Sequence, residues 1–171
     1  MKISAVLLII HLCTLSFTAN ADGGGHCEKN FSVTGKSDFT GLKPLRLKAD
    51  ERSSSEGADL LLFSDQNNKL AFILITSYGE TGKRVALYEI SDQQADSFSA
   101  RVSNYAYMAP IYAGPLKVVS VNTSSFIVCD GRVLRGAGAL EVSDGAIQQS
   151  KNEVARAVNA FNLSLHESKG R

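Results

Sequence analysis

Short apolar runs separated by polar turn residues dominate the middle of the chain. Most are rich in β-branched and aromatic residues and are bounded by Gly, Pro, Asn, Asp or Ser, which is the pattern of strands rather than helices. The sequence therefore predicts seven or eight antiparallel strands. The runs cover residues 42–47, 59–64, 70–76, 83–90, 97–102, 116–121, 125–129 and, with a Gly-rich bulge, 132–142.

The segment 114–131 has the pattern of a hairpin. Two β-branched runs, 116–121 and 125–129, flank the polar triplet Asn122-Thr123-Ser124, and Asp130-Gly131 closes the segment. Two such runs around a short polar turn predict an antiparallel pair. The loop before it, 104–114, holds three of the five tyrosines.

Residues 70–76 are the most strand-like window, and they are apolar on both faces. One face must meet the core, and the other must be covered or line a cavity. The pattern leaves open which face does which, because a slip of one residue exchanges the two sets. Residues 97–102 alternate cleanly, which predicts a half-buried strand.

The period then changes to that of a helix. Ile147, Val154, Val158, Phe161 and Leu165 share one helical face. Residues 150–153, Ser-Lys-Asn-Glu, form a predicted capping box. We expect a helix over about 150–163 whose stripe packs on the outside of the sheet. An amphipathic membrane helix is the alternative, which its few basic residues disfavour.

This order of elements predicts an all-β fold, an eight-stranded antiparallel up-and-down barrel with one C-terminal α-helix packed on the outside. Such a barrel encloses room for one small ligand. An immunoglobulin-type sandwich is the alternative. The absence of Trp and the wide spacing of the cysteines disfavour it.

Residues 1–21 have the features of a secretory signal peptide. A positive start precedes the mostly apolar segment 3–15, and Ala19-Asn20-Ala21 fits a cleavage site. An uncleaved anchor is the alternative. We expect a secreted, extracellular domain over 22–171 with no membrane span, since no other stretch approaches about 20 apolar residues.

Charge is balanced in the mature chain. The full chain has 18 Lys and Arg against 17 Asp and Glu, and one of the basic residues, Lys2, belongs to the predicted signal. A net charge near zero argues against nucleic acid or an anionic membrane as the main partner, since both require a basic face.

Two cysteines remain once Cys13 leaves with the signal. Cys27 and Cys129 are an even pair in an oxidising compartment, which predicts one disulfide. Free thiols or a metal pair are the alternatives, and no clustered histidines support a metal. Predicted N-glycosylation sites, meaningful in a eukaryotic host, are Asn30, Asn122 and Asn162.

The layout resembles a lipocalin. Asp38-Phe39-Thr40-Gly41 is similar to the start of the first lipocalin strand, although Lys43 stands where that family has Trp. Residues 97–102, 114–121 and 124–129 resemble the fifth, sixth and seventh strands, and the late helix also matches. The resemblance implies a secreted barrel that binds a small molecule.

A Cys27–Cys129 pairing is similar to the salivary lipocalins of blood-feeding bugs, the nitrophorin and triabin-like group. The second disulfide of that group has no counterpart, and Phe63 stands about where its haem-ligating histidine would lie. The resemblance therefore gives no reason to expect haem, and we expect no cofactor.

The expected function is that of a carrier for a small apolar or amphipathic ligand, such as a lipid, eicosanoid or amine. Glu89 lies inside a strand and could hold an amine, and the Tyr-rich loop could close the mouth. Small residues such as Ala100 leave space. The predicted ligand-binding residues are Phe63, Phe72, Leu74, Glu89, Phe98, Ala100, Tyr105, Tyr107, Val118 and Phe126.

A protein-binding inhibitor that uses the barrel as a scaffold is the alternative function, with an extracellular or host protein as partner and loops such as 50–57 or 104–114 as contacts. An enzyme is not expected, because the chain has no nucleophile elbow, phosphate loop or clustered acid–base set. The two mature histidines, His26 and His166, stand apart, so no metal site is expected.

Overall fold

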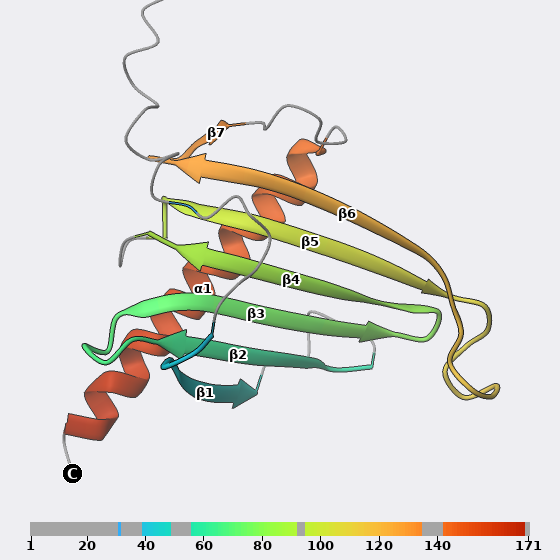
Figure 1. Ribbon diagram of the computed structural model, residues 1–171, viewed down its shortest axis with the longest axis horizontal. Coiled ribbons are helices and arrows are strands. Elements are labelled where there is room, and N and C mark those ends of the chain that lie inside the picture. Colours follow the sequence, from blue (N-terminus) through green and yellow to red (C-terminus); the bar gives the residue numbers. More distant parts are fainter. Residues whose placement is uncertain (1–30, 32–38, 49–55, 92–94, 135–141, 170–171) are drawn as a thin grey trace, which may run out of the picture.

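The computed structural model describes residues 31, 39–48, 56–91, 95–134 and 142–169. These form one antiparallel sheet in which each strand pairs with the next along the chain, and one helix (Figure 1). The elements are β1 (Lys43–Lys48), β2 (Ala58–Ser64), β3 (Leu70–Gly79), β4 (Gly82–Ile90), β5 (Phe98–Tyr107), β6 (Val118–Cys129), β7 (Arg132–Leu134) and α1 (Asp144–Lys169).

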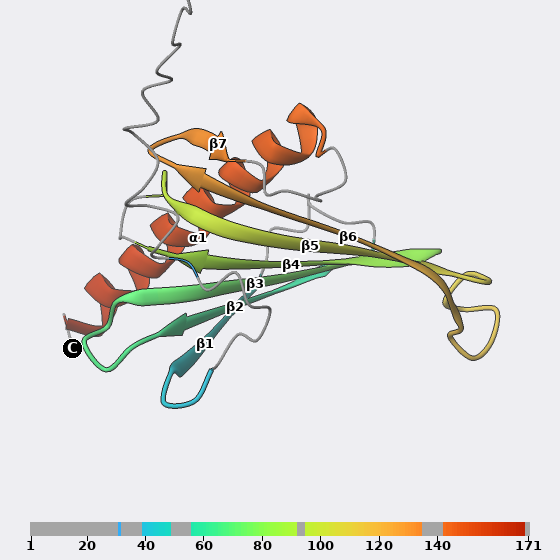
Figure 2. The ribbon, with the colours of Figure 1, turned by 45° about the horizontal axis from the view of Figure 1, so that its top comes forward.

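The predicted up-and-down order and the C-terminal helix are confirmed. The described strands make an open sheet of seven strands, in which β1 and β7 are the two ends of the strand order. Closure into an eight-stranded barrel is not confirmed. α1 crosses one face of the sheet obliquely, and the strands twist and splay toward β1 (Figure 2).

Two predicted turns form as their residues dictate. The Asp65 carboxylate accepts the backbone N–H groups of Asn67 and Lys69, both at 2.8 Å, which closes the turn between β2 and β3. Asp130 and Gly131, with φ of 49° and 72°, provide the two positive φ angles that a tight hairpin turn requires. Only three residues of the predicted strand 132–142 form β7, and 135–141 lie outside the described residues.

β6 is one continuous strand, so the predicted turn at 122–124 is wrong. Asn122 pairs with Asn104, and Thr123 pairs with Ser103, whose hydroxyl lies 2.9 Å from that of Thr123. The long ladder of pairs with β5 outweighs the local turn preference of these residues. β5 correspondingly extends to Tyr107, which places Tyr105 and Tyr107 in a strand rather than in the predicted loop.

The helix begins earlier than predicted. The Ser143 hydroxyl accepts the N–H of Ala146 at 3.3 Å, and its carbonyl accepts the N–H of Ile147 at 3.1 Å. Ser143 is therefore the N-cap, and the predicted capping box of Ser150 and Glu153 is wrong. α1 continues to Lys169, past the predicted end near 163.

The core lies between α1 and the sheet. The predicted apolar stripe of the helix is confirmed: Ile147, Val154, Val158 and Phe161 are buried, and Leu165 packs against their cluster. The stripe belongs to the same buried cluster as one cross-strand row of the sheet. That row consists of Leu62, Ile73, Tyr88, Ala100 and Phe126. α1, the helix that the described residues form, does not have the length of apolar sequence needed to cross a membrane.

Replacement of Phe161 by Ala should lower the free energy of unfolding by about 3–5 kcal/mol, because it leaves a cavity under α1. Leu163, two residues away and 65% exposed, is the matched control. Leu163→Ala should cost less than about 1 kcal/mol. Urea unfolding of both variants measures the difference, and equal losses would show that α1 is not packed as described.

Candidate functional site

The two faces of the sheet differ in burial. The face toward α1 carries the core, where Leu62, Ile73 and Tyr88 are 0% exposed. The opposite face, called here the far face, carries large apolar side chains that are all partly exposed. Its aliphatic and phenylalanine residues in β2 to β6 are Leu61, Phe63, Phe72, Leu74, Val85, Leu87, Val121 and Ile127.

Strand register aligns these residues in cross-strand rows. One row is Phe63, Phe72, Glu89, Ser99 and Ile127, and the next is Leu61, Leu74, Leu87, Arg101 and Ser125. The far face is therefore apolar over the middle of β2, β3 and β4. It is polar at Glu89 and along β5, and again at Asp59, Thr76 and Lys83.

An aromatic cluster lies at one end of the apolar part. The Phe39 ring, just before β1, lies 4.5 Å from the Phe63 ring and 5.2 Å from the Phe72 ring, measured between centroids. The pair with Phe72 is edge-on, a favourable aromatic geometry. Phe39 therefore packs on the far face and covers part of it.

The polar part of the far face holds charges of both signs. Glu89 accepts a hydrogen bond from the Ser99 hydroxyl at 3.4 Å, and Arg101 lies two residues beyond Ser99 in β5. All three are partly buried. An apolar surface next to a few polar groups is the pattern by which binding sites hold and orient amphipathic molecules.

The predicted ligand-binding residues divide between the two faces. Phe63, Phe72, Leu74 and Glu89 lie together on the far face, and the register places Tyr105 there too. Three other residues of the predicted set lie on the opposite side of the sheet. Phe98, Ala100 and Phe126 are buried on the α1 side and cannot line a cavity on the far face, since the sheet separates them.

Register explains this division. β5 alternates Phe98 and Ala100 on one side with Ser99 and Arg101 on the other, and α1 covers the more apolar side. The predicted set includes residues of both sides because the sequence pattern of the strands does not show which face the helix covers. Val118 is exposed at the start of β6, and Tyr107 follows a bulge at the end of β5.

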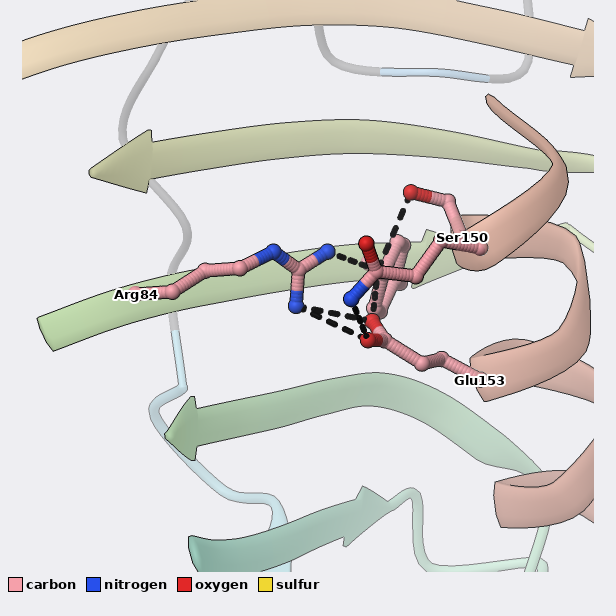
Figure 3. A network of polar contacts seen from close by, with 5 residues as sticks. Arg84, Ser150 and Glu153 are labelled. Carbon is pink, nitrogen blue, oxygen red and sulfur yellow. Dashed lines mark hydrogen bonds and ion pairs between the residues drawn. The ribbon is translucent and has the colours of Figure 1, made fainter. Parts of the chain in front are cut away.

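A polar network joins α1 to the sheet (Figure 3). Arg84 donates to both carboxylate oxygens of Glu153, at 2.9 and 3.0 Å, and to the Tyr88 hydroxyl at 3.3 Å. Tyr88 lies 2.5 Å from Glu153 and 3.2 Å from the Ser150 hydroxyl. Tyr88 has one proton, which the carboxylate accepts, so Ser150 donates to Tyr88.

Burial and charge set the protonation states of this network. Burial raises the pKa of Tyr88, and the Glu153 carboxylate raises it further, so the phenol stays protonated. Burial alone would lower the pKa of Arg84, but Tyr88 and Glu153 raise it above its ordinary value. The network is therefore a paired, hydrogen-bonded contact that fixes α1 on the sheet.

The sequence alone did not predict this network, although it contains one signal of it. Ser150 falls on the apolar stripe, three residues after Ile147 and four before Val154. A hydroxyl on a core stripe needs a partner from the element it packs against. The local Ser-x-x-Glu pattern was instead interpreted as a cap.

A polar hollow of about 520 Å³ lies at the end of the β3–β4 hairpin. Gly79, Gly82 and Ala106 line it with little side-chain bulk, and Arg84 and Gln149 also reach it. By register it opens on the α1 side of the sheet. Tyr78, Lys83 and Tyr105, which the register places on the far face, also line it.

Cys129 is disulfide-bonded. The predicted partner Cys27, the predicted signal peptide and Asn30 lie outside the described residues. Asn122 is exposed in β6, and Asn162 is half-buried on α1. In the part of the chain that the structure describes, no three His, Cys, Asp or Glu side chains gather as they would to hold a metal ion.

Comparison with known proteins found no matching family model, curated protein or solved structure.

Replacement of Glu153 by Gln should lower the free energy of unfolding by about 2–4 kcal/mol, because it leaves a largely buried guanidinium without its counter-charge. The Arg84 and Glu153 side chains are only 17% and 15% exposed. Glu167→Gln, an exposed position on the same helix, is the control and should change little. Denaturant unfolding at neutral pH measures both, and a loss no larger than the control's would contradict the role of the network.

Alkaline pH should destabilise the protein partly through Tyr88. Its pKa is raised in the folded state, so above about pH 10 an unfolded tyrosine releases its proton while the folded one keeps it. The contribution of Tyr88 to the free energy of unfolding is fully present below about pH 10 and is lost as the pH rises further. Unfolding free energies measured from pH 8 to 11 should fall less steeply for Tyr88→Phe than for the parent chain. Parallel curves would contradict the assignment.

Proposed function

We propose that the protein is a secreted carrier that holds a small apolar or amphipathic molecule against the far face of its sheet. One observation carries the proposal: the strands whose α1 side carries the buried core present large, partly exposed apolar side chains on the other side. Such a surface is a common mark of a binding site. The adjoining Glu89 and Arg101 would orient the polar end of a ligand.

Energetics support a ligand of this class. Each square ångström of apolar surface removed from water contributes roughly 25 cal/mol, before the costs of association. Phe72, Leu74 and Leu87 are neighbours on β3 and β4, so one small molecule could contact all three. A ligand with a charged or hydrogen-bonding end would also reach Glu89, which pairs with Phe72 across the strands.

A lipocalin-type barrel remains part of this proposal. In a barrel with its helix on the outer wall, the face away from the helix is the inside. The far face would therefore be the cavity wall if the sheet closed. Two observations support the assignment: the up-and-down strand order and a C-terminal helix on one face.

Secretion is supported by the disulfide of Cys129, because such bonds persist in oxidising compartments. The apolar leader in residues 1–21 is consistent with that route.

A protein-binding module is the second candidate. The observation that favours it is the apolar surface of the segment that follows β5, where Met108, Tyr112 and Leu116 are exposed. Exposed apolar residues gathered on one loop are typical of contact surfaces. Pull-down from the native secretion would give a defined partner under this alternative.

Binding of a fluorescent fatty acid tests the carrier proposal. The double variant Leu74→Gln, Leu87→Gln removes two apolar contacts from the centre of the far face. It should weaken binding at least about tenfold, since a loss of about 1.4 kcal/mol changes affinity tenfold. Leu163→Gln, an exposed apolar residue of α1, is the matched control and should bind like the parent chain.

Native mass spectra of the protein purified from its own source complete the test. A mass excess that disappears on organic extraction would identify a carried molecule. Absence of probe binding by the parent chain, together with no mass excess, would overturn the carrier proposal. Equal affinities of the double variant and the control for the probe would show that the binding site is not on the far face.

A further inference from the structure

The two outer edges of the sheet differ in how they are protected against pairing with another chain. β1 carries Lys43, Pro44, Arg46 and Lys48 within six residues. Charged side chains and proline are the devices by which edge strands resist pairing with another chain. β1 is therefore an edge that is unsuited to pairing with a further strand.

β6 has none of these devices. β7 pairs only with Ile127, Val128 and Cys129, so among the described residues no strand lies along the outer side of 118–126 (Figure 1). The segment 118–125, Val-Val-Ser-Val-Asn-Thr-Ser-Ser, has no charge and no proline. It therefore presents a row of backbone hydrogen-bonding groups without a protective feature.

The side chains of this segment also remain exposed. Val119 is 54% exposed and Val121 is 48% exposed, although both are β-branched residues that stabilise strands by cross-strand packing. A further strand along β6 would bury them and satisfy the backbone in one step.

We propose that β6 is a homodimer interface, in which residues 118–122 pair antiparallel with the same segment of a second copy. The two seven-stranded sheets would then join into one continuous sheet across a two-fold axis. This interface goes beyond the ligand-carrying role, because it uses the outer edge of β6 and requires that edge to stay unpaired within the chain, as it is in the open sheet.

A second copy fits this edge for three reasons. Antiparallel pairing of identical strands is self-complementary and closes as a two-fold dimer. The segment carries no charge, so identical strands do not repel each other. Pairing centred near Ser120 sets Val119 opposite Val121 of the second copy, twice, and β-branched cross-strand pairs are favourable.

Pairing of β6 with β1 of another copy is excluded by the same features. Pro44 lacks an N–H group, and the basic residues of β1 mark it as a protected edge. A β6-to-β1 contact would also be head-to-tail, and such contacts do not close unless they form a ring. The edge therefore favours a closed pair.

The test uses the chain produced in a bacterial periplasm, which permits the disulfide of Cys129 and adds no N-glycan. This matters because Asn122 lies within the segment and begins a glycosylation sequon. Analytical ultracentrifugation should give a mass twice that of the monomer. The variants Val119→Lys, Val121→Lys and Val119→Asp, Val121→Asp should each be monomeric, because like charges face each other across the two-fold axis.

An equimolar mixture of the Lys and Asp double variants should restore the dimer, since opposite charges then face each other. Leu163→Lys, which places a charge on an exposed apolar residue of α1, is the control and should stay dimeric. Amide hydrogen exchange of the parent chain needs no variant. Dilution to the monomer should speed exchange in 118–122 and leave β3 and β4 unchanged.

Two results would overturn the proposal. The first is a parent chain that stays monomeric at about 0.1 mM, a concentration that would populate even a weak dimer. The second is a dimer that persists in both double variants, or whose dilution leaves exchange in 118–122 unchanged, since either would place the interface elsewhere.

Discussion

The packing of α1 against one face of the sheet is the contact on which the rest of the structure depends. A meander of antiparallel strands has two faces and no intrinsic preference for which becomes the core. The stripe from Ile147 to Phe161 buries one of them, and the pairing of Arg84 with Glu153 adds a directional contact. Apolar packing tolerates small slides, whereas the bidentate pair and the Tyr88 hydroxyl require one position of the helix. The helix therefore decides which side chains are core and which face the other way.

That choice gives the far face its character. β3 is apolar on both sides, with Ile73 buried and Leu74 partly exposed. In a sheet with one solvated face, the outward positions are expected to be polar. β5 follows that rule through Ser99, Arg101 and Ser103, but the central far-face positions of β2, β3 and β4 do not. The departure is confined to neighbouring strands, so it forms a contiguous surface rather than scattered exposed residues. A site on that surface requires no catalytic constellation, only apolar area with a few polar groups beside it.

The sequence predicted the elements well where the signal is local. Period-two alternation located β5, and the Asp65 and Asp130-Gly131 turns have the residues their backbone angles require. The prediction was wrong where a contact with a residue far away in the sequence determines the local structure. Asn122-Thr123-Ser124 favours a turn in isolation, but β5 offers it a full ladder. Ser150 and Glu153 fit a cap locally, yet Tyr88 and Arg84 bind them from 62 and 69 residues away. The predicted ligand-binding residues fall on both faces for the same reason, since periodicity shows two faces but not which one the helix covers.

In an open meander, the residues of the outer strands determine whether those strands can pair with another chain. A closed barrel removes its edges by pairing the first strand with the last, and the described strands do not make that pairing. β1 compensates with proline and basic residues, which cost it cross-strand packing. β6 keeps strand-forming valines and uncharged polar residues along most of its length, while β7 covers only its last three residues. β1 is protected against strand pairing and β6 is not, which is consistent with a β6 edge that is available to another strand. The same openness that leaves the far face accessible therefore also leaves β6 able to pair.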